Sequence, residues 1–251
     1  MKLWLSTCCI LLLSFSVLAQ DDYVSEKKRR KNKGFTNIPN PDFTNYTLTA
    51  SAYTLKKRDF RFTNTDIVFT KVSYGLSNNT MVSGNMSFAG TFVGSIKHKI
   101  NLNEGVDLAF TGSIGQALYL PTDSFVMVTG GQSILTFGDY QNNFTIGTGL
   151  YYAKANYVMV NDEDELFFNN IFIGAQRQIK PKTYLLGEAM YFWNYNSFIG
   201  SIAMKFIIKT RFSLIVGLMP IWQHARISAN RSSVEGGVLP VIAFRMWLNR
   251  N

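Results

Sequence analysis

The chain has almost no cysteine: of its 251 residues only Cys8 and Cys9 carry a thiol, and both lie within the first ten positions. If the N-terminal segment that contains them is removed, the remaining chain has no thiol at all. A disulfide framework, a cysteine-ligated zinc site and a catalytic thiol are then excluded.

Charged residues are also scarce, at 16% of the chain, whereas hydrophobic residues make up 47% and aromatic residues 14%. A disordered chain has the opposite composition, and a coiled coil is dominated by Ala, Glu, Lys, Leu and Arg. Both classes are excluded for most of the sequence. The balance of 25 Lys and Arg against 16 Asp and Glu gives a formal charge of +9.

Long apolar runs are missing beyond the first twenty residues. The best candidate for a spanning helix, residues 198–222, is interrupted by Lys205, Lys209 and Arg211. Each such charge costs about 3 kcal/mol near the centre of a membrane helix. We therefore do not expect the chain to cross a membrane with helices.

The N-terminus has the features of an export signal. Residues 3–17 are mostly apolar, a small residue follows at Ala19, and Asp21 and Asp22 come directly afterwards. The apolar core is short for a membrane-anchoring helix, which is the alternative. We predict a signal peptide over residues 1–19, with the exported chain beginning at Gln20.

Residues 20–45 are polar and basic, and positions 27–33 carry six positive charges. Like charges repel, and little here can be buried, so we predict a disordered basic tail in the periplasm. Such a run is usually only solvated, but it could also bind an anionic polymer of the cell envelope. A nucleic-acid partner is not expected for an exported chain.

Most of the remaining sequence alternates with a period of two. In residues 106–119, Val106, Leu108 and Phe110 share one parity, whereas Asp107 and Thr111 share the other. Successive side chains of a strand point to opposite faces, so this segregation predicts a strand and not a helix. The same period recurs in residues 82–88, 92–100, 144–152, 198–206 and 212–218.

Polar connections separate these runs. One set is short, at residues 77–79, 101–105, 138–143, 180–182 and 209–210. The alternate set includes two long members and lies at residues 56–59, 89–90, 121–124, 155–165, 194–196 and 223–236. With Thr47–Leu55 counted as the first strand, the runs number about 12 (10–12). Short turns on one side and longer loops on the other are typical of outer-membrane barrels. We predict an all-β fold: one antiparallel, up-and-down transmembrane β-barrel over residues 46–251.

A soluble β-sandwich or lipocalin-like barrel would alternate too. There the polar face would meet water, but here that face is rich in Ser, Thr, Gly and Asn and sparse in charge. Aromatic residues also gather near the run ends, where a membrane barrel carries its interfacial girdles. We predict Tyr119, Trp193, Trp222 and Trp247 as interfacial aromatics.

Two short blocks carry a family resemblance. Residues 51–57 read Ser-Ala-Tyr-Thr-Leu-Lys-Lys, and residues 74–79 read Tyr-Gly-Leu-Ser-Asn-Asn. With the Ala19–Gln20 junction, they resemble small outer-membrane β-barrel proteins of the Bacteroidota type, most of which have no assigned function. The resemblance implies the barrel fold and the cell outer membrane. That location would bring contact with outer-membrane lipid and lipopolysaccharide.

Residues suited to catalysis are few. The exported chain has two histidines: no serine or acid lies two residues from His98 along its strand face, and Ser228 lies four residues after His224. On a strand, four residues span about 14 Å, far beyond the roughly 3 Å needed for proton transfer. We predict no enzyme, no cofactor and no metal site. A lipid-modifying enzyme of the outer membrane stays a distant alternative.

The polar parity of the strands holds more cations than acids. We predict that it lines the lumen with Lys71, Lys97, Lys99, Asp107, Glu188, Lys205, Arg211 and Arg245. Eight strands leave no channel and sixteen leave an aqueous one, so twelve could form a narrow passive channel with mild anion preference. The alternative is a non-conducting structural or interaction barrel, if side chains fill the lumen.

Overall fold

The computed structural model describes residues 44–248, except 67–68, 88–89, 120–123, 158–161, 210 and 229–230. The predicted signal peptide and nearly all of the basic tail lie outside the described residues. Twelve strands follow one another: β1 (Phe60–Thr65), β2 (Phe69–Gly75), β3 (Thr80–Ser87), β4 (Thr91–Asn103), β5 (Val106–Tyr119), β6 (Ser124–Gly138), β7 (Asn143–Tyr157), β8 (Asp162–Lys180), β9 (Thr183–Phe192), β10 (Ser197–Lys209), β11 (Phe212–Ser228) and β12 (Arg231–Leu248).

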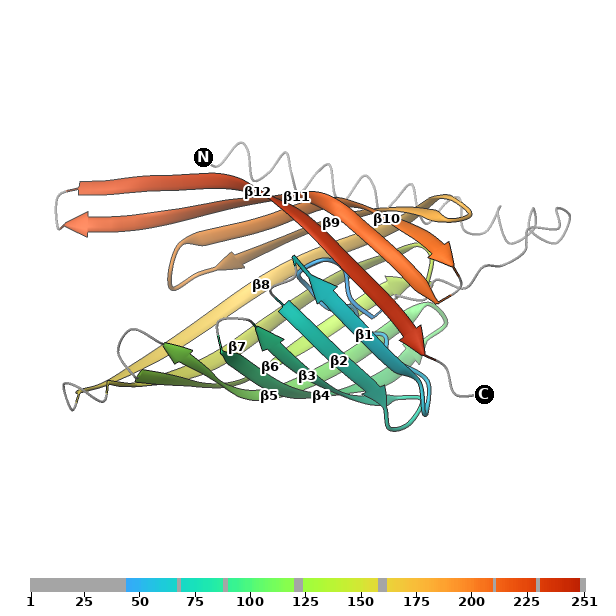
Figure 1. Cartoon of the computed structure of the whole chain (residues 1–251), viewed down its shortest axis with the longest axis horizontal. Coiled ribbons are helices and arrows are strands. Elements are labelled where there is room, and N and C mark those ends of the chain that lie inside the picture. The colour runs from blue at the N-terminus through green and yellow to red at the C-terminus, as the bar shows by residue number, and fades with distance from the viewer. Residues whose placement is uncertain are drawn as a thin grey trace, which may run out of the picture.

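The strands close into a single antiparallel barrel (Figure 1). Each strand pairs with its neighbours in sequence, and the ring is completed by β1 and β12. Their register runs from Phe60 opposite Leu248 to Thr65 opposite Ala243. The predicted up-and-down, twelve-stranded architecture is confirmed. Because β1 is short, it covers only the last part of β12, and the preceding part of β12 pairs with β11 alone.

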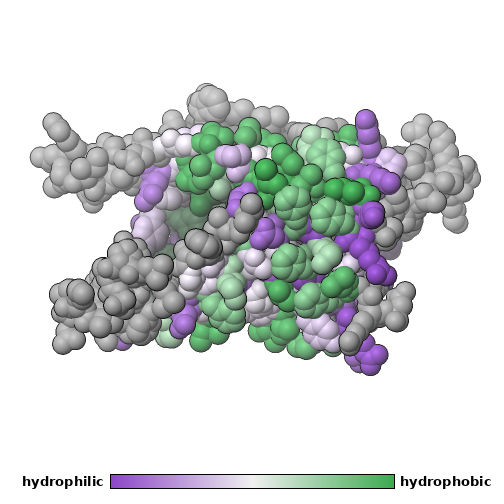
Figure 2. Space-filling model, viewed as in Figure 1, coloured by the Kyte–Doolittle hydropathy of each residue, from purple (hydrophilic) through white to green (hydrophobic). Residues whose placement is uncertain are grey.

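The outer surface of the barrel is apolar and its inner surface is mixed. On β5, Ala109 is fully buried, whereas Phe110 and Ile114 are 48% and 61% exposed. The same alternation recurs around the ring, so a hydrophobic band covers the middle of the molecule, with polar residues gathered toward its ends (Figure 2). No helix among the described residues has the length and hydropathy needed to span a membrane.

The two ends of the barrel differ. We call the end where β1 begins and β12 finishes the near end; there the turns are short, for example at Gly105 and at Pro181. We call the opposite end the far end. The prediction of two long loops at the far end is wrong. Strands β7 and β8 stay paired up to Tyr157 and Asp162, and β11 and β12 up to Ser228 and Arg231. Backbone pairing, with one register shift between Arg226 and Ser228, extends these hairpins where loops were expected (Figure 1).

The strand count is correct although one predicted strand does not form. Thr47–Leu55 is not a strand of the barrel, so the wall begins at Phe60 and not at Tyr46. The lost strand is replaced because the chain reverses after β1, where no connection was predicted. Asp66 has a positive φ of 53°, its N–H donates to Ile242 O at 2.7 Å, and its carboxylate accepts from Ile242 N–H at 2.6 Å.

Candidate functional site: a hairpin inside the barrel

The segment expected to form the first strand folds back on itself inside the barrel. Asn45 and Ala50 form an isolated bridge, Tyr46 N–H donates to Thr49 O at 2.9 Å, and Ser51 N–H donates to Thr44 O at 3.1 Å. We call residues 44–55 the lumenal hairpin. It is the blue segment before β1 that lies within the ring of strands (Figure 1).

One carboxylate holds the tip of the lumenal hairpin. Glu188 on β9 accepts the backbone N–H groups of Thr47, Leu48 and Thr49 at 2.9, 2.8 and 2.7 Å. The Thr49 hydroxyl donates at 2.8 Å, and the Ser201 hydroxyl from β10 donates at 2.6 Å. Five donors therefore converge on one carboxylate, and such charge-assisted bonds are stronger than neutral ones.

Cationic side chains bind carbonyl groups on both strands of the hairpin. Lys97 Nζ on β4 donates to Thr44 O at 3.3 Å and to Ser51 O at 3.0 Å. Arg245 on β12 donates to Asn45 O at 3.1 Å and also to Tyr46 O. Both cations are buried, so the carbonyl dipoles offset part of the cost of removing their charges from water.

Hydroxyl groups tie the hairpin to the β6–β7 side of the wall. Ala52 N–H donates to Thr136 Oγ1 at 2.8 Å, and Thr136 and Thr145 share a hydrogen bond of 2.7 Å. The Tyr46 hydroxyl contacts Thr145 Oγ1 at 2.7 Å and donates to Asn143 Oδ1. Burial raises the pKa of Tyr46, so its hydroxyl stays protonated and can act as a donor.

Apolar contacts add to the polar ones. Ala52 is fully buried in a cluster with Ala109, Ile134 and Phe172, which come from β5, β6 and β8. The Tyr46 ring lies over Gly174, where an added Cβ would approach it to 2.6 Å. A side chain at this position would therefore displace the hairpin.

Close backbone contacts fix the point where the hairpin joins the wall. Thr54 Oγ1 donates to Asn78 O at 2.9 Å, and Arg58 N–H donates to Gly75 O at 2.8 Å. A Cβ on Gly75 would lie 1.9 Å from Lys56 O, so only glycine allows the chain to pass here. The hairpin therefore enters the lumen from the near end.

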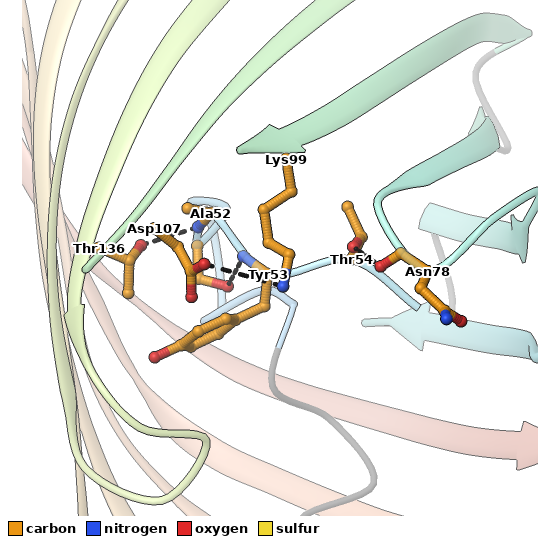
Figure 3. Close-up of polar contacts among 8 residues, drawn as sticks. Ala52, Tyr53, Thr54, Asn78, Lys99, Asp107 and Thr136 are labelled. Atoms are coloured by element: carbon orange, nitrogen blue, oxygen red, sulfur yellow. Dashed lines mark hydrogen bonds and ion pairs between the residues drawn. The ribbon is translucent and has the colours of Figure 1, made fainter. Parts of the chain in front are cut away.

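Figure 3 shows Lys99, Asp107 and Thr136 pointing from the wall toward residues 52–54. Lys99 Nζ and Asp107 Oδ1 are 3.8 Å apart and form an ion pair. These two residues, on β4 and β5, lie beside the hairpin near its entrance. Their opposite charges pair with each other, so they add little net charge to the lumen.

The predicted lumen residues fall into distinct environments. Lys97, Lys99, Glu188, Lys205 and Arg245 are buried on the inner face. Lys205 donates to Gln176 Oε1 of β8 and lies 5.0 Å from the Tyr184 ring centroid.

Two of the remaining predicted residues lie inside but are less buried, and one does not line the lumen. Lys71 is half-buried, and Asp107 is 15% exposed. Arg211 is exposed in the β10–β11 turn, because β11 begins only at Phe212. Sequence reasoning missed Arg61, which is buried on β1. Its parity with Thr63 could have revealed it, had the short strand been recognised.

The predicted interfacial aromatics also differ among themselves. Trp193 and Trp222 are exposed at the far end, and Trp222 packs against Phe198 with ring centroids 5.6 Å apart. Trp247 is half-buried and shares its parity with buried Arg245, whereas the outward positions of β12 are even-numbered. It therefore does not belong to an outer girdle. Tyr119 ends β5, and its side chain lies outside the described residues.

The two histidines lie on different strands. His98 is exposed on the outward parity of β4, and its Nδ1 contacts the Thr80 hydroxyl at 2.9 Å. His224 lies on β11, and its side chain is outside the described residues. The contact of His98 joins two exposed groups on the outer wall, away from the lumenal hairpin.

No protein-family model matches the sequence, and no curated protein matches it either. Among solved structures, the NanC porin aligns with 75% of this chain and 97% of its own, with a TM-score of 0.46 and 8% identity. The KdgM porin, solved in complex with disordered oligogalacturonate, aligns with 75% of this chain and 95% of its own (TM-score 0.41, 8% identity). The N-terminal β-barrel domain of Pseudomonas aeruginosa OprF aligns with 77% of this chain and 100% of its own, with a TM-score of 0.29 and 14% identity. At such low similarity the matches bear on neither substrate nor activity, and the Bacteroidota-type resemblance stays a prediction.

Proposed function

We propose that the protein is an integral outer-membrane β-barrel whose lumen is closed by its own lumenal hairpin, and that it is a channel when the hairpin leaves. The apolar outer surface supports a lipid environment. Large side chains such as Ile114, Leu150 and Ile202 are more than half exposed on it. Facing water, so many apolar groups would be costly; facing lipid, they are stable.

One observation supports the closed state more than any other: the hairpin forms hydrogen bonds with strands on opposite sides of the barrel. Lys97 on β4, Thr136 on β6, Glu188 on β9 and Arg245 on β12 all bond to residues 44–52. Inward charges that would line an open pore are thus used to hold a segment in place. This favours a closed resting state over a permanently open pore.

The anion preference applies to the open state. Arg61, Lys71, Lys97, Lys205 and Arg245 face inward in addition to the Lys99–Asp107 pair, and Glu188 is the acid among them. Once the hairpin leaves, these cations would meet water and raise the local concentration of anions. We propose that transport, where it occurs, is of small anions and involves no catalysis.

The test is conductance in a planar bilayer. The chain that begins at Gln20 is compared with a variant lacking residues 44–55, in which residue 43 joins Lys56 directly. We expect rare, brief openings in the first and sustained conductance in the second. Heat-modifiable migration on gels checks that both barrels fold. Equal, measurable conductance of the two proteins would refute closure by the hairpin. If both proteins fold but neither conducts, the result would favour the non-conducting alternative.

A further inference from the structure

Three cations converge on three successive residues of the lumenal hairpin. Lys97 bonds to Thr44 O, and Arg245 bonds to the carbonyl groups of Asn45 and Tyr46. With the Asn45 amide oriented so that its oxygen faces Lys71, that oxygen accepts from Lys71 Nζ at 3.1 Å. The three cations come from β4, β12 and β2, so only the folded barrel brings them together.

The hairpin brings no negative charge to this cluster. Residues 44–55 contain no acidic side chain, so the hairpin binds these cations through neutral carbonyl and amide oxygens. Like charges that are buried close together repel one another. An anion with several oxygens would bind the same donors more strongly, because both partners would then be charged.

We infer that Lys71, Lys97 and Arg245 form an anion-binding site that the backbone of Thr44–Tyr46 occupies in the closed state. A solute that bears phosphate or carboxylate oxygens competes for these donors. Since it binds only when the hairpin is out, it shifts the equilibrium toward the open barrel in proportion to its concentration. The inference rests on the proposed function: the anion is both the opener of the channel and the class of solute that enters it.

The competition can be measured without recording current. Ala52 is fully buried beside Ala109, so a cysteine placed there reacts with a small neutral maleimide only when the hairpin is released. The chain from Gln20 has no other thiol. The labelling rate of Ala52→Cys is followed as inorganic phosphate is raised, with chloride at matched ionic strength as reference. A separate series with citrate tests carboxylate oxygens.

The rate should rise about tenfold at a phosphate concentration ten times its Kd, while chloride leaves it unchanged. A rise with both phosphate and citrate indicates a general oxyanion site, and a rise with only one identifies the oxygen source. Adding Lys97→Gln and Arg245→Gln should raise the basal rate and remove the phosphate dependence. The matched control Lys182→Gln, at an exposed turn, should keep it.

Labelling that ignores phosphate and citrate, or that responds equally in the Lys97→Gln/Arg245→Gln variant, would overturn the anion site. Closure by the hairpin would survive that result if deletion of residues 44–55 still opened the channel. If deletion changes nothing, the proposed function itself fails, whatever the labelling shows.

Discussion

The Glu188 carboxylate binds Thr49 twice, through its backbone N–H at 2.7 Å and its hydroxyl at 2.8 Å. This contact joins a residue of the lumenal hairpin to one 139 positions later, on β9. Because the carboxylate also accepts from Thr47 and Leu48, it is the main polar anchor of the hairpin tip.

Replacing this carboxylate should loosen the tip. Glu188→Gln removes the charge and puts an NH₂ group against N–H donors. Hydrogen bonds to a charged group contribute about 1.5–3 kcal/mol, so the released fraction should rise roughly 10- to 100-fold. Maleimide labelling of a cysteine at position 52 measures this fraction. Glu165→Gln, exposed on β8, should leave it unchanged. A Glu188→Gln variant that labels no faster would show that Glu188 is not an anchor.

Packing at Ala52 should be equally sensitive. Ala52→Phe forces a ring into the cluster with Ala109, Ile134 and Phe172, and overpacking of this kind costs about 1–3 kcal/mol. The hairpin should undock and the bilayer conductance should increase while the barrel stays heat-modifiable. Leu48→Phe, at the partly exposed tip, is the matched control and should conduct like the unmodified chain. Similar conductance in both variants would argue against tight docking of Ala52.

Charge should be penalised on the outer face and tolerated on the inner one. Phe110→Arg exposes a cation to lipid and should cost about 2–4 kcal/mol of unfolding free energy. Ser113→Arg, on the inward parity of the same strand, should cost less because this position does not face lipid and is partly exposed, so water can reach the new charge. Urea unfolding in lipid vesicles, followed by tryptophan fluorescence, compares the two. The reverse order would invalidate the assignment of the faces.

Ion selectivity tests the inward cations directly. In the variant lacking residues 44–55, Lys97→Glu with Lys205→Glu should move the reversal potential under a salt gradient toward cation selectivity. Arg211→Glu, at the exposed β10–β11 turn, should move it less. A reversal potential unaffected by the Lys97→Glu/Lys205→Glu pair would mean that ions do not pass these two residues.

The barrel could be predicted from the sequence because its determinant is local. Successive residues of a strand, such as Ala109 and Phe110, point to opposite faces of the sheet. The alternation of apolar and polar residues is therefore enough to predict both the strand and its apolar face. Turn residues between the runs then give an approximate strand count. Asp66 was missed because one aspartate in a polar run is a weak turn signal, and its role depends on Ile242, far along the chain.

The lumenal hairpin could not be predicted in the same way. Thr47–Leu55 alternates as a strand does, and its sequence does not show that its partners are side chains of distant strands. Glu188, Lys97 and Arg245 were predicted to line a path through the barrel, whereas in the structure they face inward and bind the hairpin. Their common partner becomes visible only when β4, β9 and β12 are placed around one lumen.

Closure of the lumen by the hairpin is tested most directly by a reversible lock. Ala52 and Ala109 are both fully buried in one cluster, so we choose Ala52→Cys and Ala109→Cys as the pair to be oxidised to a disulfide, in a chain that has no other thiol once it begins at Gln20. Gel migration verifies the bond, and Ala109→Cys alone controls for the oxidant. Bilayer conductance of the oxidised protein should fall to background and recover when a reductant is added to the same membrane. Openings that persist at the same frequency and size with the disulfide intact would contradict the account.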